Sequence, residues 1–590
     1  MTEKFTQALN DSHSINNTED LLVGTLNQPK AYTQNNAISN PSPDASGETA
    51  GRMALFFKSV RGLTDNQLEE YLIKASSESI LDTFLIAFYI RDCRGGKGER
   101  ELGRKCLRWL SRYPEQFNSI IKYISEYGRW DDYLVLLEAL EKPKPSRRVK
   151  KVSSDSDDDS EKNNSCFIGI IDSSNSSNSC FTGITDSNII TALISSFSLQ
   201  LKNDLQTMNE GKPCTLVAKW APTENCSLDR KYDLVNKICK NLSISKRNYR
   251  KTYLAPLRAY IKIVERYMCH KNWEAIDYSS VPSCAMKRLK KAFSKNDPIR
   301  FEEWKAKLQK GEVKVNAKQL YPHELVRDVY ASDDNIISDA QWNVLVEKTK
   351  KMGVFSNSLV VVDVSGSMGS MGQKKFCPIH ASVALGLIIS ECIQGPLQNQ
   401  IITFHATPTF FNVQGSTLKE RINSISQAPW GGNTNFQKIF DLILSKAKEY
   451  KLKQEDMPKT LYILSDMQFD QAVSLDGKEE KTNYQMVLDK FNMAGYTPPN
   501  IIFWNLNGNS VDFPCTTNDF GTAMISGFST DILKSILTLG RIDPYNVMRV
   551  TIDSERYHPV ADAIKNTLSI PEIESHTSSS GWLSGWFSKA

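Results

Sequence analysis

The chain has 590 residues, of which 40% are hydrophobic and 24% are charged, and its formal net charge is +5. This length excludes a single hydrophobic core and predicts two or three domains, while the composition is that of an ordinary globular protein. The small net charge excludes no class of partner by itself.

The N-terminal part of the chain is predicted to be an arm followed by paired helices. Residues 1–50 are rich in Asn, Ser, Thr and Pro, so we expect a flexible arm there. Helical periodicity then covers residues 51–142, and Thr64 is a suitable N-cap. Because consecutive helices pair across glycine-containing turns, this stretch predicts the first part of a helical-repeat body.

The glycine-rich stretch RGGKGER, residues 94–100, falls inside this helical part. It lacks the G-x-x-x-x-G-K-[ST] pattern and follows a predicted helix, so a nucleotide loop is not expected. We interpret its glycines as a turn. A second interpretation makes Arg94, Lys97 and Arg100 a basic edge that binds an anion.

Residues 143–190 are predicted to be a low-complexity insertion, with a basic cluster followed by an acidic, serine-rich tract. The repeated motifs SCFIGIIDS and SCFTGITDS indicate a local duplication inside a tolerated surface segment. An alternative interpretation is a phosphorylation tract around Ser153, Ser154 and Ser156.

Helical sequence resumes over residues 191–352, the second and basic part of the predicted helical body. Residues 231–300 contain 17 Lys or Arg against 5 Asp or Glu, with aromatic residues interleaved. Cations for phosphates and rings for stacked bases are what a nucleic-acid surface needs. The alternative is a solvated basic face over an aromatic core. The candidate contacts are Lys246, Arg247, Arg250, Lys251, Arg258, Lys287 and Arg288.

From residue 353 to residue 560, short apolar runs alternate with amphipathic helices. Strands are expected at 358–364, 399–405, 460–466, 499–506 and 522–527, with helices between them. This alternation predicts an α/β domain with a doubly wound, Rossmann-like parallel sheet. Ligands of such sheets bind at the carboxyl ends of the strands.

Polar side chains gather at those strand ends. The first strand runs into Asp363, Ser365 and Ser367, the loop PWGGNTNFQ supplies Thr434, and a later strand ends at Asp466. Carboxylate and hydroxyl oxygens without His or Cys form a ligand set for a hard divalent cation, Mg²⁺ or Mn²⁺. The alternative is an Asx-turn that binds no metal.

This set resembles the metal-ion-dependent adhesion site of von Willebrand factor A domains, whose pattern is D-x-S-x-S, then Thr, then Asp. The resemblance implies that Ser365, Ser367 and Thr434 are direct ligands and that Asp363 and Asp466 act mainly through waters and hydrogen bonds. It also implies that the cation captures an acidic group, Asp or Glu, of a protein partner.

The wider chain, through RDCRGGKGERELG, KWAPTE and NWEAIDYSSVPSCAMKR, resembles a family of large uncharacterised proteins of plants, fungi and giant viruses. The order of parts is similar to that of the Ro autoantigen, a helical-repeat ring (the TROVE module) followed by a von Willebrand A domain. That similarity of architecture implies small structured RNA as a second ligand.

We therefore expect a binding or scaffold protein without enzymatic activity. Protein assembly without RNA is one alternative, and a hydrolase-type enzyme is another, although no general base is recognisable near the predicted site. Twelve cysteines without a C-x-x-C pair argue against zinc and disulfide frameworks. With no predicted signal peptide or transmembrane segment, they indicate an intracellular, cytoplasmic protein, or a virion protein if the source is a giant virus. Residues 561–590 are expected to form a C-terminal tail.

Overall fold

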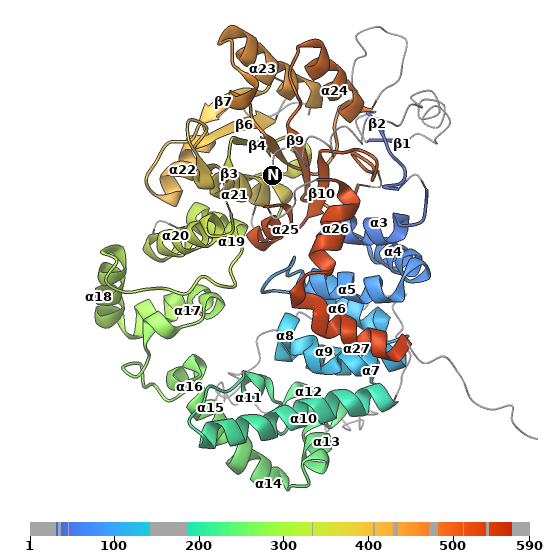
Figure 1. Cartoon of the computed structure of the whole chain (residues 1–590). Helices are drawn as coiled ribbons and strands as arrows, with labels where there is room; N and C mark the ends of the chain where they lie inside the picture. Colours follow the sequence, from blue (N-terminus) through green and yellow to red (C-terminus); the bar gives the residue numbers. More distant parts are fainter. Residues whose placement is uncertain are drawn as a thin grey trace, which may run out of the picture.

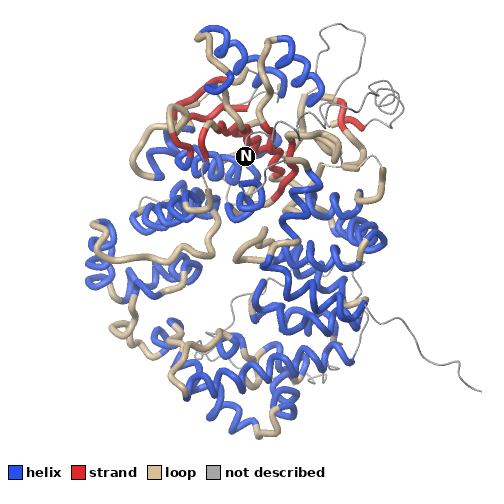
Figure 2. The backbone as a smooth tube through the Cα atoms, viewed as in Figure 1, coloured by secondary structure: helices blue, strands red, loops and turns tan. Residues whose placement is uncertain are grey.

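The computed structural model describes residues 31–33, 37–44, 46–141, 187–332, 334–353, 355–373, 375–404, 407–428, 435–470, 482–510, 512–537 and 542–568. The predicted insertion lies outside these residues except for its last four, which begin a helix, and residues 569–590 of the predicted tail also lie outside them. Figures 1 and 2 show a large helical body and, at one end of the molecule, a domain that contains the main sheet.

The first part of the helical body is a series of short helices joined by tight turns. Their bounds are α3 (Ala50–Lys58), α4 (Asp65–Glu78), α5 (Ile80–Arg91), α6 (Arg100–Leu110), α7 (Pro114–Ile120), α8 (Ile124–Tyr127) and α9 (Trp130–Leu140). Thr64 caps α4 as predicted, because its hydroxyl accepts the Gln67 N–H and the Gln67 side chain accepts the Thr64 N–H. Helix α5 has apolar residues on all sides and is buried along nearly its whole length, which places it at the centre of this part.

The second part of the body begins with a long helix and continues through shorter ones. Their bounds are α10 (Ser187–Asn209), α11 (Val217–Trp220), α12 (Ser227–Tyr232), α13 (Leu234–Asn241), α14 (Lys246–Asn248), the π-helix η2 (Tyr249–Leu254), α15 (Ala255–Tyr260), α16 (Val264–Cys269), α17 (Ser283–Asn296), α18 (Pro298–Gln309), α19 (Pro322–Tyr330) and α20 (Ile336–Lys350). Helices α16 to α18 enclose a small core of their own, centred on Tyr278, Phe293 and Phe301. Most of the other buried apolar side chains form one continuous core from Ala37 to Ile564.

The main sheet has six strands in the order β10-β9-β8-β4-β6-β7. Their bounds are β4 (Ser358–Asp363), β6 (Gln400–Phe404), β7 (Thr409–Asn412), β8 (Thr460–Ser465), β9 (Asn500–Asn505) and β10 (Thr522–Ser526). All neighbours pair in parallel except β7, which pairs antiparallel with β6. The five predicted strands are therefore present, and β7 is an edge strand that the sequence analysis did not identify.

Helices cover both faces of this sheet and join it to the helical body (Figure 1). The sheet domain contains α21 (Pro378–Cys392), α22 (Leu418–Ile425), α23 (Phe436–Glu449), α24 (Asn483–Met493), α25 (Leu533–Leu537), α26 (Pro544–Ile552) and α27 (His558–Leu568), with a short β3–β5 pair (Phe355–Ser356 and Ile393–Gln394). Helix α21 packs on β4 and also contacts α19 and α20, while α3 packs against β10. Helix α27 packs on α5 and α7, so the chain closes on itself.

The structure corrects the prediction of a flexible arm for residues 31–33 and 37–44. Strands β1 (Ala31–Tyr32) and β2 (Ile38–Ser39) pair with each other, and Asn40 pairs antiparallel with Phe513. The Thr33 hydroxyl donates to the Phe469 carbonyl (2.6 Å), and the Ser39 hydroxyl donates to Asp512 Oδ2 (2.6 Å). Composition indicated a solvated segment, but these contacts with the sheet domain, more than 400 residues away in sequence, order it.

Candidate functional site

The end of β4 positions the first cluster of polar side chains. All six residues of β4 are buried, and Asp363, its last residue, has an exposed fraction of 0%. The chain then turns at once, because Asp363 Oδ1 accepts the Ser365 N–H (2.9 Å) and a 3₁₀ turn follows over Gly366–Met368. This turn brings the hydroxyl oxygens of Ser365 and Ser367 to 3.1 Å from each other.

The neighbouring strand β8 ends beside β4 and completes the described part of the cluster. The Ser465 hydroxyl donates to Asp363 Oδ2 (2.5 Å) and accepts the Met467 N–H (3.1 Å). Asp466 follows directly, is 3% exposed, and accepts the Gln468 N–H at Oδ1 (3.3 Å). The structure thus brings together four of the five predicted site residues. Sequence reasoning missed Ser465 as a member, although a serine at the strand end before Asp466 was a usable signal.

The electrostatics of this cluster favour a bound cation. Burial raises the pKa of Asp363 to about 7, and the neighbouring charge of Asp466 adds to the shift. Burial also raises the pKa of Asp466, whereas interaction with the Ser367 hydroxyl lowers it. Asp466 thus raises the pKa of Asp363, and among the described residues no Lys or Arg forms an ion pair with either carboxylate.

The oxygen atoms also suit Mg²⁺ in geometry. Octahedral Mg²⁺ has ligands at about 2.0–2.1 Å, so adjacent ligands lie about 2.9 Å apart. The separation of the Ser365 and Ser367 hydroxyl oxygens, 3.1 Å, is close to this value. Both Asp363 oxygens already accept hydrogen bonds from the protein, which fits a carboxylate that orients the hydroxyls.

The fifth predicted ligand, Thr434, lies outside the described residues. The chain is described again from Asn435, which caps α23 by accepting the Lys438 N–H (3.2 Å). Within the described ranges, no group of three or more His, Cys, Asp or Glu side chains could hold a metal ion. Any cation at the described cluster would therefore depend on hydroxyl ligands.

The glycine-rich loop of residues 94–100 is a structural junction, and the anion-binding interpretation is wrong for Lys97. This side chain is 0% exposed, and its Nζ donates to the Ser59 carbonyl (3.1 Å), the Ser526 hydroxyl (2.6 Å) and the Phe56 carbonyl. The Arg94 guanidinium is exposed but donates to the Glu126 (2.5 Å) and Gly128 (2.9 Å) carbonyls at the end of α8. Sequence could not show that the loop faces three distant segments.

Some of the remaining predicted anion contacts are bonded to other groups of the protein, and others are exposed and form no ion pair with a described residue. Arg258 donates to the Ala218 (2.9 Å) and Ala221 (2.8 Å) carbonyls and so caps α11. Ion pairs join Arg100 to Asp131 (3.2 Å), Lys246 to Glu224 (3.8 Å), Lys287 to Asp328 (3.2 Å) and Arg288 to Glu265 (3.6 Å). By contrast, Arg247, Arg250 and Lys251 are exposed and form no ion pair with any described residue. We call these three residues the basic cluster.

Helix α17 carries a second set of exposed cations. Ala285, Met286 and Phe293 are buried on one side of the helix, and Arg288, Lys291 and Lys295 are exposed on the other. We call these three residues the α17 ridge. Most aromatic residues of this region are buried, as the core alternative predicted: Tyr249, Tyr253, Tyr278 and Phe293 are at most 9% exposed.

Comparison with known proteins finds family models, a relative and solved structures that are similar to this chain. Residues 188–355 match the model "Domain of unknown function (DUF2828)", and residues 357–569 match "Domain of unknown function (DUF7788)". The "Uncharacterized protein L728" of Acanthamoeba polyphaga mimivirus is 31% identical over 544 residues, which cover 88% of this chain and 87% of that protein. The crystal structure of the Deinococcus radiodurans RO (RSR) protein is 12% identical, with a TM-score of 0.28 over 87% of this chain and 88% of that one. At this TM-score the likeness supports no functional argument. No helix in the described ranges could cross a membrane.

Proposed function

This chain belongs to the same family as the mimivirus protein L728, and we propose that it is a binding and scaffold protein whose sheet edge holds Mg²⁺ or Mn²⁺ and captures an acidic group of a protein partner. The observation that carries the proposal is the meeting of Asp363, Ser365, Ser367 and Asp466 at the ends of the adjacent strands β4 and β8.

Each residue has a distinct role in this proposal. Ser365 and Ser367 bind the cation through their hydroxyl oxygens, and Thr434 adds a third hydroxyl. Asp363 fixes the turn and the Ser465 hydroxyl, and with Asp466 it supplies negative charge near the ion. When bound, the cation would act as a Lewis acid that coordinates a carboxylate of the protein partner. The sheet order, with parallel strands and one antiparallel edge strand, supports the assignment to the von Willebrand A class.

The test is the binding of Mn²⁺ by the full chain, measured by electron paramagnetic resonance and calorimetry. We expect Asp363→Asn to weaken binding at least about tenfold, because it removes a buried charge beside the ion. The control is Asp456→Asn, which neutralises an exposed carboxylate in the same domain and should leave binding unchanged. Equal Mn²⁺ affinities of wild type and Asp363→Asn would contradict the proposal. Binding of a protein partner that persists after EDTA has removed the cation would contradict it as well.

A second candidate function is the binding of RNA or another polyanion by the helical body. The observation that favours it is the exposure of the basic cluster and of the α17 ridge. Binding of single-stranded RNA should weaken steeply with salt, with a log–log slope of about −0.7 for each phosphate neutralised.

The triple variant Arg247→Gln, Arg250→Gln, Lys251→Gln, which removes the three positive charges of the basic cluster, tests this second function. It should reduce the salt slope by about 2, because three phosphate contacts are lost. The control Lys448→Gln, Lys451→Gln removes exposed lysines from the sheet domain and should not change the slope. If both variants behave alike, RNA is not bound at the basic cluster.

A further inference from the structure

Two cysteines lie where the first helices contact the second part of the helical body. Cys93 follows the end of α5, and Cys284 belongs to the first turn of α17. At this contact the Tyr321 hydroxyl donates to the Gly98 carbonyl (2.7 Å), and the Arg129 guanidinium donates to the Cys284 sulfur. We call the contact made by these five residues the body seam. Both of its cysteines are free thiols and half-buried, so each is partly open to solvent.

Each thiol of the body seam has a guanidinium beside it. Arg129 interacts with both sulfur atoms, and Arg94 Nη1 lies 3.7 Å from Cys93 Sγ. Neither arginine forms an ion pair with a carboxylate of the described residues, since Asp131 acts on Arg129 only at longer range and Arg94 donates to backbone carbonyls. A positive charge beside a sulfur stabilises the thiolate, the form that attacks a disulfide.

Other thiols of the chain lie in surroundings that disfavour the thiolate. Cys214 is half-buried like the two seam thiols, but its sulfur lies 3.3 Å from the Asp204 carbonyl oxygen. Burial and the neighbouring charge of Asp204 raise the pKa of the Cys214 thiol. Burial likewise raises the pKa of the thiols of Cys106, Cys239, Cys377, Cys392 and Cys515.

We propose that Cys93 and Cys284 form a site of thiol–disulfide exchange with a low-molecular-weight disulfide that carries carboxylates. A cysteine thiol loses its proton, and the thiolate attacks one sulfur of the disulfide. A new S–S bond then joins that sulfur to the protein, and the other half leaves as a thiolate that takes up a proton from the solvent. Arg94 and Arg129 stabilise the attacking thiolate and attract the negatively charged reagent.

The exchange would also change the body seam itself. A group attached to the Cys284 sulfur takes the place of the thiol that accepts the hydrogen bond from Arg129, so the contact between the two parts of the body loses that bond. The site depends neither on the cation proposed at the sheet edge nor on RNA binding.

The experiment treats the reduced full chain with oxidised glutathione, which is anionic, and in parallel with cystamine, which is cationic. Peptide mass spectrometry follows the modification of each cysteine with time. We expect glutathione to modify Cys93 and Cys284 at least about tenfold faster than Cys214, the half-buried internal control. The ratio of the glutathione rate to the cystamine rate should also be higher at the two seam thiols than at Cys214.

Substitutions of Arg129 test the role of the guanidinium. Arg129→Met should slow the modification of Cys284 at least about fivefold, whereas Arg129→Lys, which keeps the positive charge, should retain most of the rate. The control Arg247→Met removes an exposed guanidinium from the same body and should leave the rate unchanged. Circular dichroism checks that each variant is folded, and the comparison of the two probes on wild type needs no variant.

Two results would overturn the proposal. One is equal glutathione rates at Cys284 and Cys214 in the wild type. The other is a faster modification of Cys284 in folded Arg129→Met, because it would show that the arginine only shields the thiol from solvent.

Discussion

At the scale of single residues, burial decides what a charged side chain can do. Lys58 and Lys97 are both 0% exposed, and both connect the end of α3 to the sheet domain. Burial lowers the pKa of each ammonium to about 7. These lysines belong to the domain interface, so they cannot serve as binding residues without local unfolding.

The lowered pKa of Lys97 predicts a pH-dependent stability. Between pH 7 and about 10.5 the unfolded state binds more protons than the folded state, so stability should rise with pH across this window and fall again as pH drops to 7. The contribution is at most about 1.4 kcal/mol per pH unit. Replacing Lys97 with Met should reduce this dependence by about half, because the pKa of Lys58 is lowered to about 7 as well; the measurement is the thermal midpoint from pH 7 to pH 10. A slope equal to that of wild type would show that the lysine does not titrate there.

Gly98 offers a second prediction about a single residue. Its φ is +67°, and a Cβ there would lie 1.9 Å from the Tyr321 hydroxyl oxygen, which donates to the Gly98 carbonyl (2.7 Å). We expect Gly98→Ala to lower the unfolding free energy by about 3 kcal/mol, from backbone strain and steric overlap together. Gly211→Ala is the control, because Gly211 has φ +71° and no atom within 4 Å of its Cβ position. It should cost only about 1–2 kcal/mol.

At the scale of elements, the segment from α26 to α27 connects the sheet domain to the first helices. Arg556 pairs with Asp92 at the end of α5, with Arg556 Nη2 to Asp92 Oδ1 at 2.7 Å, and it also lies over the Tyr127 ring. Arg549 pairs with Asp82 (2.7 Å). Because Asp92 is fully buried, its carboxylate depends for solvation on Arg556, on the Tyr557 hydroxyl and on the Arg94 N–H.

Removing the Arg556 guanidinium should therefore lower the free energy of unfolding. We expect Arg556→Met to destabilise the protein by about 3–5 kcal/mol, since it leaves a buried carboxylate unpaired. Adding Asp92→Asn to this variant should recover part of the loss. Arg549→Met is the comparison, because Arg52 still pairs with Asp82 (2.7 Å), and it should cost clearly less. Thermal unfolding and hydrogen exchange of α27 measure both effects, and equal losses would contradict this account.

At the scale of the whole molecule, one continuous core connects the two ends of the chain. Residues from Ala37 to Ile564 share it, because α27 packs on α5 and α7 and α3 packs on β10. The helical body and the sheet domain are therefore not independent units. Figure 1 shows the sheet domain in contact with both the first and the last helices of the body.

Because the core is continuous, we expect two fragments of the chain to remain associated after the chain is cut between them. Residues 1–141 and 187–590, expressed together as two chains, should purify as a 1:1 complex, because the interfaces of α27 and α10 with the first helices remain. Adding Arg556→Met should weaken the complex in gel filtration. Separate elution of the two unmodified pieces would show that chain connectivity, and not the core, holds them together.

The local features of this protein follow from short stretches of sequence. The five parallel strands and the residues at the ends of β4 and β8 could be predicted, because apolar runs and turn-forming residues act over a few positions. The Thr64 cap could be predicted for the same reason. Whether each basic side chain is buried or exposed could not be predicted, because no local pattern distinguishes the buried Lys97 from the exposed Lys251.

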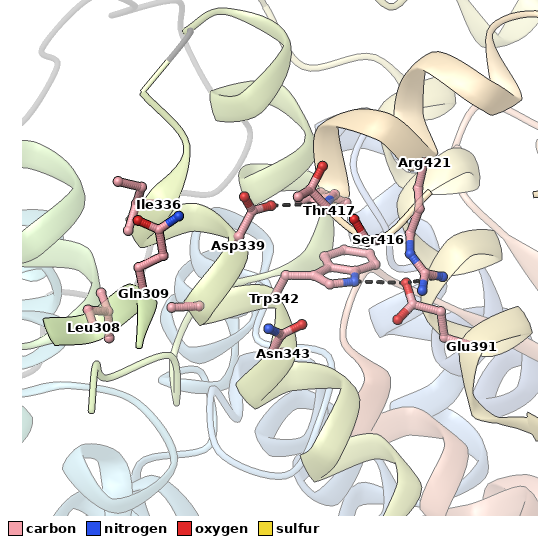
Figure 3. A pocket seen from close by; sticks show the side chains of 12 residues that line it. Leu308, Gln309, Ile336, Asp339, Trp342, Asn343, Glu391, Ser416, Thr417 and Arg421 are labelled. Carbon is pink, nitrogen blue, oxygen red and sulfur yellow. Dashed lines mark hydrogen bonds and ion pairs between the residues drawn. The ribbon is translucent and has the colours of Figure 1, made fainter. Parts of the chain in front are cut away.

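Tertiary structure alone decided the rest. Two contacts join residues far apart in sequence: the pairing of Asn40 with Phe513 and the ion pair of Asp92 with Arg556. A cavity between α20 and α22 is likewise lined by residues from distant parts of the chain (Figure 3). The edge strand β7 is short and only partly buried, so its sequence lacks the apolar run that marks the central strands. Such features depend on which surfaces meet when the chain closes on itself, and that is a property of packing across the whole molecule.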